Sequence, residues 1–256
     1  MDKTTKGAGR ASGPARQDEL PGEVAELVGE ISQGSSLSRR RRVMAATSRI
    51  ARRSGRAGWS GVASGGRWLT SQVLAMAPRL PVRDQQKLRA QFPGLGPEEV
   101  ADRLIQGASR AAASVGAAVG ASMVLPLPSA PVELGFETMA LVGIELKLVA
   151  ELHEVYGMRA PGAAPERMVA YVVAWAHRRG VALVPGGLAL AVGSPLRRQL
   201  ERRLIARAGR SAVSLGPLLT GAAAGAMLNR RETRRLGAEV RNDLRRRSAQ
   251  GAGWPD

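Results

Sequence analysis

Three long stretches without a charged side chain, all rich in small residues, constrain what this chain can fold into. They span residues 111–125, 181–196 and 211–229. Gly116 and Gly120 in the first, and Gly221 and Gly225 in the third, have the four-residue spacing that lets two helices approach closely. Aromatic residues make up only 3% of the chain, so its core must consist mostly of Ala, Val and Leu. Such material favours packed helices over β-sandwiches and barrels.

The hydrophobic periodicity predicts an all-α fold, a Gly/Ala-rich helical bundle with Arg-rich amphipathic flanking helices. The clearest expected helix spans 131–156 and is apolar around most of its circumference, which is typical of a central helix. Gly157 is expected to end it in the left-handed conformation. Another helix is expected to start with Gly96 and Pro97. Further helices are expected over 166–179 and along Leu236, Val240 and Leu244. No segment shows convincing strand alternation, and the uncharged stretches are interpreted as buried helices.

The composition shifts predict four segments. Residues 1–36 are expected to be a flexible tail with a short acidic amphipathic helix, 37–87 a basic amphipathic helical segment, 88–249 the helical core domain, and 250–256 a tail. The acidic helix places its apolar residues at helical spacing opposite four glutamates. It is either a short solvated helix or a docking helix that covers a basic surface of this chain or of a partner. Its apolar residues are Leu20, Val24, Leu27, Val28 and Ile31.

The net charge of +17 is concentrated at the two ends of the chain. Residues 1–110 carry 19 basic and 10 acidic groups, residues 111–196 carry 5 and 6, and residues 197–256 carry 14 and 5. Arg supplies 34 of the 38 basic residues, and a GC-rich genome would raise Arg, Ala, Gly and Pro together. Part of the excess is therefore attributable to codon usage, but the basic–neutral–basic layout indicates two cationic arms around an apolar centre.

The basic segment after residue 37 has the pattern of a cationic amphipathic helix that lies on anionic membranes. Two tryptophans follow it, and Trp beside Arg is a common pairing at membrane interfaces. The alternative is an ordinary solvated face. The candidate membrane- or anion-binding residues are Arg39, Arg40, Arg41, Arg42, Arg49, Arg52, Arg53, Trp59 and Trp68. The uncharged stretches are too short or too interrupted to span a bilayer, which needs about 20 apolar residues; monotopic insertion of a Gly/Ala hairpin remains the alternative.

No catalytic or metal-binding motif is present. The chain has no Cys and only two His, and no His-Glu-x-x-His, phosphate-loop, dinucleotide-binding or Gly-x-Ser-x-Gly motif occurs. We therefore expect no enzymatic activity, metal or cofactor.

One group of polar residues does lie on the central helix: Glu145, Lys147, Glu151 and His153. Buried carboxylates need cations, so we interpret it as an ion-pair network that sets helix register. A pocket for a small ligand or lipid headgroup is the alternative.

Three motifs together resemble the EcsC family of bacterial helical proteins. They are Pro93-Gly94-x-x-Pro97-Glu98-Glu99-x-Ala101-Asp102-x-Leu104-Ile105, Glu151-Leu152-x-x-Val155-Tyr156-Gly157, and Gly216-Pro217-Leu218-x-x-Gly221-x-x-x-Gly225-x-x-x-Asn229. The resemblance covers roughly residues 88–245. It implies an all-helical fold and an association with membranes or transport, and it brings no agreed reaction. Asn229 falls on the family's glycine–asparagine motif, where the resemblance implies capping or hydrogen bonding between helices.

The sequence thus predicts a non-enzymatic helical protein that binds anionic membrane surfaces or membrane proteins. We expect it in the cytoplasm, peripheral at the inner face of the cell membrane, because no charged-then-apolar leader opens the chain. The alternatives are a nucleic-acid-binding basic protein and a soluble scaffold with a small-ligand or lipid pocket. Scarce aromatic residues argue against the nucleic-acid alternative.

Overall fold

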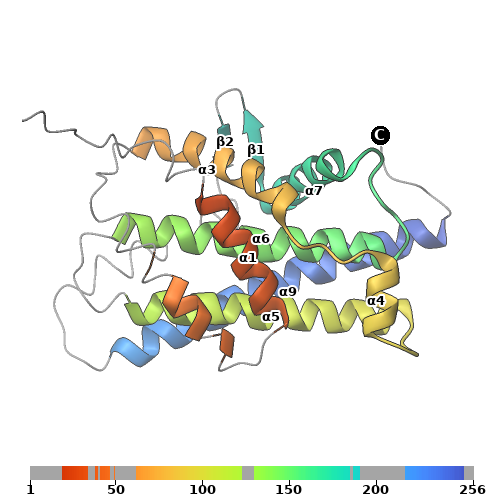
Figure 1. The fold of residues 1–256 in the computed structure, drawn as a ribbon, viewed down its shortest axis with the longest axis horizontal. Helices are drawn as coiled ribbons and strands as arrows, with labels where there is room; N and C mark the ends of the chain where they lie inside the picture. The colour runs from red at the N-terminus through yellow and green to blue at the C-terminus, as the bar shows by residue number, and fades with distance from the viewer. Residues whose placement is uncertain are drawn as a thin grey trace, which may run out of the picture.

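The computed structural model describes residues 19–33, 38–39, 41–46, 49, 62–122, 130–184, 187–190 and 217–250. Its fold is all-α, with one short pair of strands as the exception (Figure 1). The helices are α1 (Leu20–Gln33), α3 (Val62–Met76), η1 (Ala77–Arg79), α4 (Gln85–Gln91), α5 (Pro97–Ser122), α6 (Ala130–Val155), α7 (Ala164–Arg179) and α9 (Pro217–Ala249). Residues 1–18 of the predicted segment 1–36 and residues 251–256 of the predicted tail lie outside the described residues.

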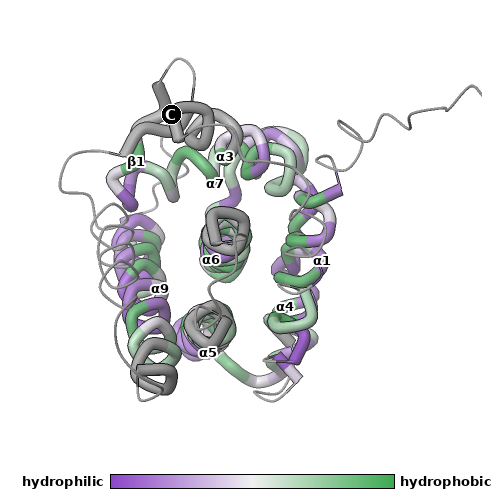
Figure 2. Tube along the Cα trace, turned by 90° about the vertical axis from the view of Figure 1, so that its left-hand side faces the viewer, coloured by the Kyte–Doolittle hydropathy of each residue, from purple (hydrophilic) through white to green (hydrophobic). Residues whose placement is uncertain are grey.

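Helix α6 lies at the centre of the molecule, with the other helices around it (Figure 2). From Gly135 to Val155 every side chain is buried except Leu141, which is half-buried. The prediction that a helix apolar nearly all round is central is therefore confirmed. Burial on all sides also explains why the charged side chains of α6 need partners inside the protein.

Helices α5 and α9 run antiparallel and approach closely at two glycines. A Cβ atom on Gly116 would lie 2.5 Å from the Gly225 carbonyl oxygen, and one on Gly225 would lie 2.9 Å from the Gly116 carbonyl oxygen. The predicted close approach of small-residue helices thus occurs, with Gly116 and Gly225 as its contact point. On α9, the predicted apolar residues Leu236, Val240 and Leu244 are all buried.

Helix α1 is part of the core, so the interpretation as a short solvated helix is wrong. Val24, Val28 and Ile31 are fully buried, and a Cβ atom on Gly143 of α6 would lie 2.9 Å from Val28 Cγ2. Apolar area is removed from water on both sides of this contact, which is the main force holding α1 in place. Residues on both sides of the predicted boundary at 87/88 share one hydrophobic core.

The predicted helix ends are largely confirmed. Helix α5 begins at Pro97, and the Val100 N–H donates to the Gly96 carbonyl at 3.0 Å. The Glu99 carboxylate accepts a hydrogen bond from the Gly96 N–H at 2.9 Å, which also places a negative charge near the helix N-terminus. Gly157 follows α6 with φ 68°, a left-handed conformation that glycine adopts without a Cβ clash.

Residues 181–184 and 187–190 form two paired strands, not the buried helix interpreted from the sequence. Strand β1 (Val181–Val184) pairs antiparallel with β2 (Gly187–Leu190), with Val181 opposite Leu190. Pro185, Gly186 and Gly187 interrupt this stretch in the sequence. The four residues on each side are too few to nucleate a stable helix, whereas pairing as strands satisfies their backbone groups.

Among the described residues, no helix combines the length and apolar character needed to cross a bilayer.

Candidate functional site

The Glu145 carboxylate on α6 is the centre of a buried cluster drawn from three helices. It accepts hydrogen bonds from Trp175 Nε1 at 2.8 Å and Arg179 Nε at 3.0 Å, both on α7. Arg179 makes a second contact through NH2, and Thr233 Oγ1 of α9 donates at 3.0 Å. Glu145 is only 5% exposed. The expectation that this carboxylate finds a cation is confirmed, and its two oxygens accept four hydrogen bonds.

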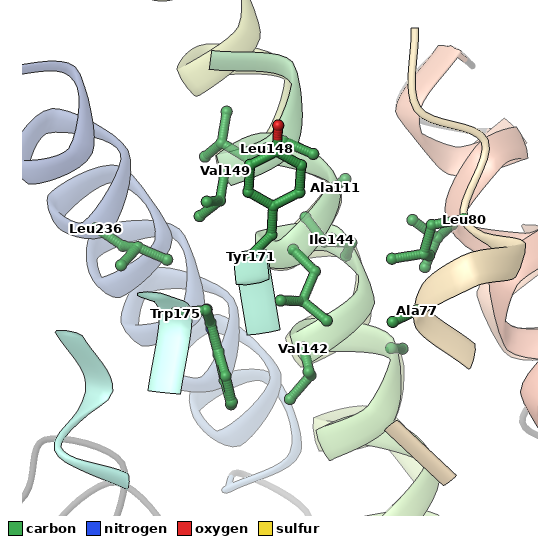
Figure 3. Close-up of a cluster of buried hydrophobic side chains, with 14 of the residues drawn as sticks. Ala77, Leu80, Ala111, Val142, Ile144, Leu148, Val149, Tyr171, Trp175 and Leu236 are labelled. Atoms are coloured by element: carbon green, nitrogen blue, oxygen red, sulfur yellow. The ribbon is translucent and has the colours of Figure 1, made fainter. Parts of the chain in front are cut away.

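Arg179 links this cluster to a second carboxylate on α9. Its NH1 atom lies 3.4 Å from Glu232 Oε2. Burial acts to lower the pKa of Arg179, but the negative charges of Glu145 and Glu232 outweigh it and the pKa is raised. The guanidinium therefore stays charged and fixed between α6 and α9. Figure 3 shows that Trp175 lies in the same apolar cluster as Leu236 and Val142.

A second buried cluster surrounds Glu151, two turns further along α6. Arg83 binds it through Nε at 2.7 Å and NH2 at 2.6 Å, and the Arg83 backbone N–H donates at 3.2 Å. The predicted pair between Lys147 and Glu151 is present. Lys147 Nζ also donates to the Pro81 carbonyl at 2.7 Å. These bonds hold the segment between η1 and α4 against the central helix.

Lys147 is buried beside the Glu151 carboxylate. Burial lowers its pKa, and the adjacent Glu151 carboxylate opposes this effect. One turn away, Glu154 accepts from the Gln85 N–H at 3.0 Å and from Arg159 Nε at 2.7 Å. Glu145, Glu151 and Glu154 of α6 are thus each paired with an arginine from another part of the chain.

His153 is a buried, neutral side chain. Its Nδ1 atom lies 2.7 Å from the Val149 carbonyl oxygen, so Nδ1 carries the proton and donates it. The imidazole also faces the Tyr171 ring at a centroid distance of 5.0 Å. Burial lowers the pKa of His153 to about 4, with Arg178 and Arg247 contributing. Its surroundings make it a structural residue of the α6–α7 contact.

Asn229 on α9 makes the hydrogen bonds between helices that the family resemblance implies. Its Nδ2 atom lies 3.4 Å from the Ala112 carbonyl oxygen of α5 and 3.4 Å from Glu137 Oε1 of α6. Asn229 is 1% exposed and lies next to Gly116. It joins three helices at the point where α5 and α9 approach most closely.

The ionisable groups in these clusters are paired with one another. Glu145, Glu151 and Glu154 each bind at least one cation, and a saturated carboxylate has little capacity to act as a general base. No group of three or more His, Asp or Glu side chains in the described ranges is arranged to hold a metal ion. The sequence did not identify the partners Arg83, Arg179 and Thr233, since each is remote in sequence from its carboxylate.

The predicted basic segment divides into outward and inward residues. Arg41, Arg42 and Arg49 are exposed, and Arg42 NH1 lies 3.6 Å from Glu30 Oε2 of α1, with both side chains about half exposed. Arg39 departs from the prediction of a surface residue: it is 9% exposed, and its Nε atom has no hydrogen-bond partner within the described ranges. Burial, together with Arg110, lowers its pKa.

Arg40, Arg52, Arg53 and Trp59 lie outside the described residues, as does the side chain of Trp68, whose backbone belongs to α3.

Helix α9 carries a further set of arginines that the predicted site omitted. Arg230, Arg231 and Arg234 are exposed, and none forms an ion pair with another described residue. We call these three residues the α9 arginine face. Elsewhere on the helix, Arg235 pairs with Glu239, and Arg246 and Arg247 pair with Asp243. The signal was available in the sequence as the run Asn229–Leu236, which holds four arginines and one glutamate.

No family model matches the chain, and no curated protein or solved structure matches it either. The resemblance to the EcsC family stays a prediction from the three motifs quoted above.

Proposed function

We propose that this is a non-enzymatic helical protein that binds anionic membrane surfaces, peripherally and at the inner face of the cell membrane. The observation that carries the proposal is the α9 arginine face, three exposed guanidinium groups within one turn and a half of a helix. No carboxylate in the described part of the chain forms an ion pair with any of the three. Such a positively charged face attracts an anionic surface.

The expected strength of binding follows from the charge. Each Lys or Arg near an anionic leaflet contributes about 1 kcal/mol, and the effect falls off within a Debye length. The three residues of the α9 arginine face would therefore contribute about 3 kcal/mol at low ionic strength. The exposed residues Arg41 and Arg49 add to the positive surface. Binding of this size is reversible and sensitive to salt.

The interior of the protein supports a non-enzymatic role. The buried carboxylates of α6 are engaged by Arg83, Lys147, Arg159 and Arg179. Such a network fixes how helices pack, and it occupies these carboxylates with structural ion pairs. The EcsC resemblance, which implies membrane association, belongs to this proposal.

The test is sedimentation of the full chain with vesicles. Zwitterionic phosphatidylcholine vesicles are compared with vesicles that also contain phosphatidylglycerol, at low and high salt. We expect binding only to the anionic vesicles, and release by salt. Replacing the α9 arginine face by Gln (Arg230→Gln, Arg231→Gln and Arg234→Gln) should remove most of the binding.

A charge-matched control separates a specific face from net charge. Arg79, Arg89 and Arg167 lie on η1, α4 and α7, and their replacement by Gln removes the same three charges. This control should still bind. Equal loss in both variants, or no binding to any vesicle composition, would overturn the proposal. Preferential binding to duplex DNA or RNA in competition would favour the nucleic-acid alternative, although each described Trp, Tyr and Phe side chain is buried or half-buried, which disfavours base stacking.

A further inference from the structure

One line of exposed side chains along α9 changes from apolar to cationic within one helical turn. Ala223, Met227, Arg230 and Arg234 follow one another at spacings of four, three and four residues, so they lie along one line of the helix. All four are exposed, and Met227 is 72% exposed. The first half of this line is apolar and the second half is cationic. Met227 is the most exposed large apolar side chain among the described residues.

The same charge boundary occurs at the same level of the neighbouring helix. Gly116 lies against Gly225, and Asn229 donates to the Ala112 carbonyl. Further along, Arg241 pairs with Asp102. This antiparallel register places Arg110, the last charged residue of α5, next to the residues that follow Arg230 on α9.

Beyond this level both helices are free of charge. Residues 111–122 of α5 and 217–229 of α9 contain no Asp, Glu, Lys or Arg. The α5–α9 pair therefore has an uncharged end, which Figure 1 shows at the left, and an Arg-rich remainder. Arg110, Arg230 and Arg231 mark the border between the two parts.

The length of the uncharged end fits one leaflet of a bilayer. Thirteen helical residues, 217–229, extend for about 20 Å at about 1.5 Å per residue. Half of a hydrocarbon core that is about 30 Å thick is about 15 Å. The end is thus too short to span a membrane and long enough to enter one leaflet at a tilt, with the arginines at the level of the lipid phosphates.

We propose that the uncharged end of α9 inserts into one leaflet, with Met227 in the hydrocarbon and the α9 arginine face on the phosphates. This inference rests on the proposed function and adds the depth and orientation of binding. A bilayer fits better than a second protein surface because apolar and cationic groups succeed one another along a single line, as hydrocarbon and phosphate do across a leaflet.

The absence of cysteine makes a direct depth measurement straightforward. Met227→Cys is labelled with an environment-sensitive fluorophore, and Val169→Cys on α7, which is 51% exposed in the native chain, provides the matched control. Vesicles of phosphatidylcholine and phosphatidylglycerol carry a quencher on the acyl chain. We expect a blue shift and acyl-chain quenching at position 227, with neither effect at position 169.

Met227→Asp should weaken vesicle binding about ten-fold, because a carboxylate resists entry into hydrocarbon. Val169→Asp should leave vesicle binding unchanged.

The outcomes distinguish this inference from the proposed function. If the protein binds anionic vesicles but the label at 227 stays in water, the insertion is overturned and peripheral binding stands. If no vesicle binds, both fail. If the label at 227 is shielded without vesicles and the chain sediments as a dimer, a second copy covers this line of side chains and the insertion is again overturned.

Discussion

At the scale of single residues, the protein is organised by charges that have been taken out of water. Glu145 and Arg179 are 5% and 6% exposed, and each would be costly to bury alone. Together they form charge-assisted hydrogen bonds, supplemented by Trp175 and Thr233. The attraction within such a pair is offset by the free-energy cost of removing both ions from water. We therefore expect its main effect to be on how α6, α7 and α9 pack, and not on overall stability.

Neutralising Glu145 alone should be more harmful than removing both charges. Glu145→Gln leaves the Arg179 guanidinium buried beside an uncharged amide, and we expect the free energy of unfolding to fall by about 3 kcal/mol. Glu145→Gln combined with Arg179→Met removes the stranded charge and should recover part of the loss. Urea unfolding of the four proteins of this double-mutant cycle measures the coupling. Additive effects would show that the two residues do not act as a pair.

His153 should make the protein sensitive to mild acid. The pKa of His153 is about 4 in the folded state and about 6.5 when unfolded, so the unfolded state binds the extra proton between these values. Stability is therefore complete above pH 6.5 and decreases as the pH falls towards 4, by about 2 kcal/mol at pH 5.

The variant His153→Asn keeps a donor for the Val149 carbonyl and does not titrate. Urea unfolding at pH 7.5 and pH 5 should show a smaller acid loss for the variant than for the native chain. An identical loss in both proteins would assign the acid sensitivity to the carboxylates instead.

At the scale of elements, glycine decides which helices can touch. Gly116 and Gly225 face each other backbone to backbone, so any side chain there must push α5 and α9 apart. We expect Gly116→Ala to lower the free energy of unfolding by about 2 kcal/mol, in the range of overpacked cores. Thermal unfolding followed by circular dichroism measures the effect.

Gly107, on the same helix, provides the control for this prediction. A Cβ atom there meets nothing within 4 Å. Gly107→Ala should therefore stabilise α5 by up to about 1 kcal/mol, since alanine is the better helix former. If both substitutions have the same sign, the close approach at Gly116 is not what limits packing.

At the scale of the whole molecule, one core joins segments that the sequence assigned to separate regions. Val28 in α1 and Leu244 in α9 belong to the same set of buried residues. We expect a single calorimetric transition whose enthalpy agrees with the van't Hoff value. Val28→Ala should shift this whole transition down by several degrees, since a lost kcal/mol lowers Tm by about 2 to 4 °C in a chain of this size. Two transitions, of which only one moves, would support the boundary at 87/88.

The sequence by itself determined the local features of this protein. The all-α class, the central position of α6, the start of α5 at Pro97 and the left-handed Gly157 follow from periodicity, capping and glycine's conformational freedom. Each depends on residues within a few turns of one another. The pair of Lys147 with Glu151 could be predicted for the same reason, because residues four apart share a helix face.

Only the tertiary structure decided which distant groups meet. Arg179 lies 34 residues from Glu145 and Arg83 lies 68 from Glu151, and no local pattern identifies such partners. The burial of α1 and the strands β1 and β2 were likewise not predicted, since packing against other elements, and not intrinsic propensity, settles the structure of short segments. The charge boundary shared by Arg110 and Arg230 became visible once Gly116 and Gly225 fixed the register of the two helices. The packing of α5 against α9 thus aligns their uncharged ends on one side and their arginines on the other, which the order of charges along the chain does not show.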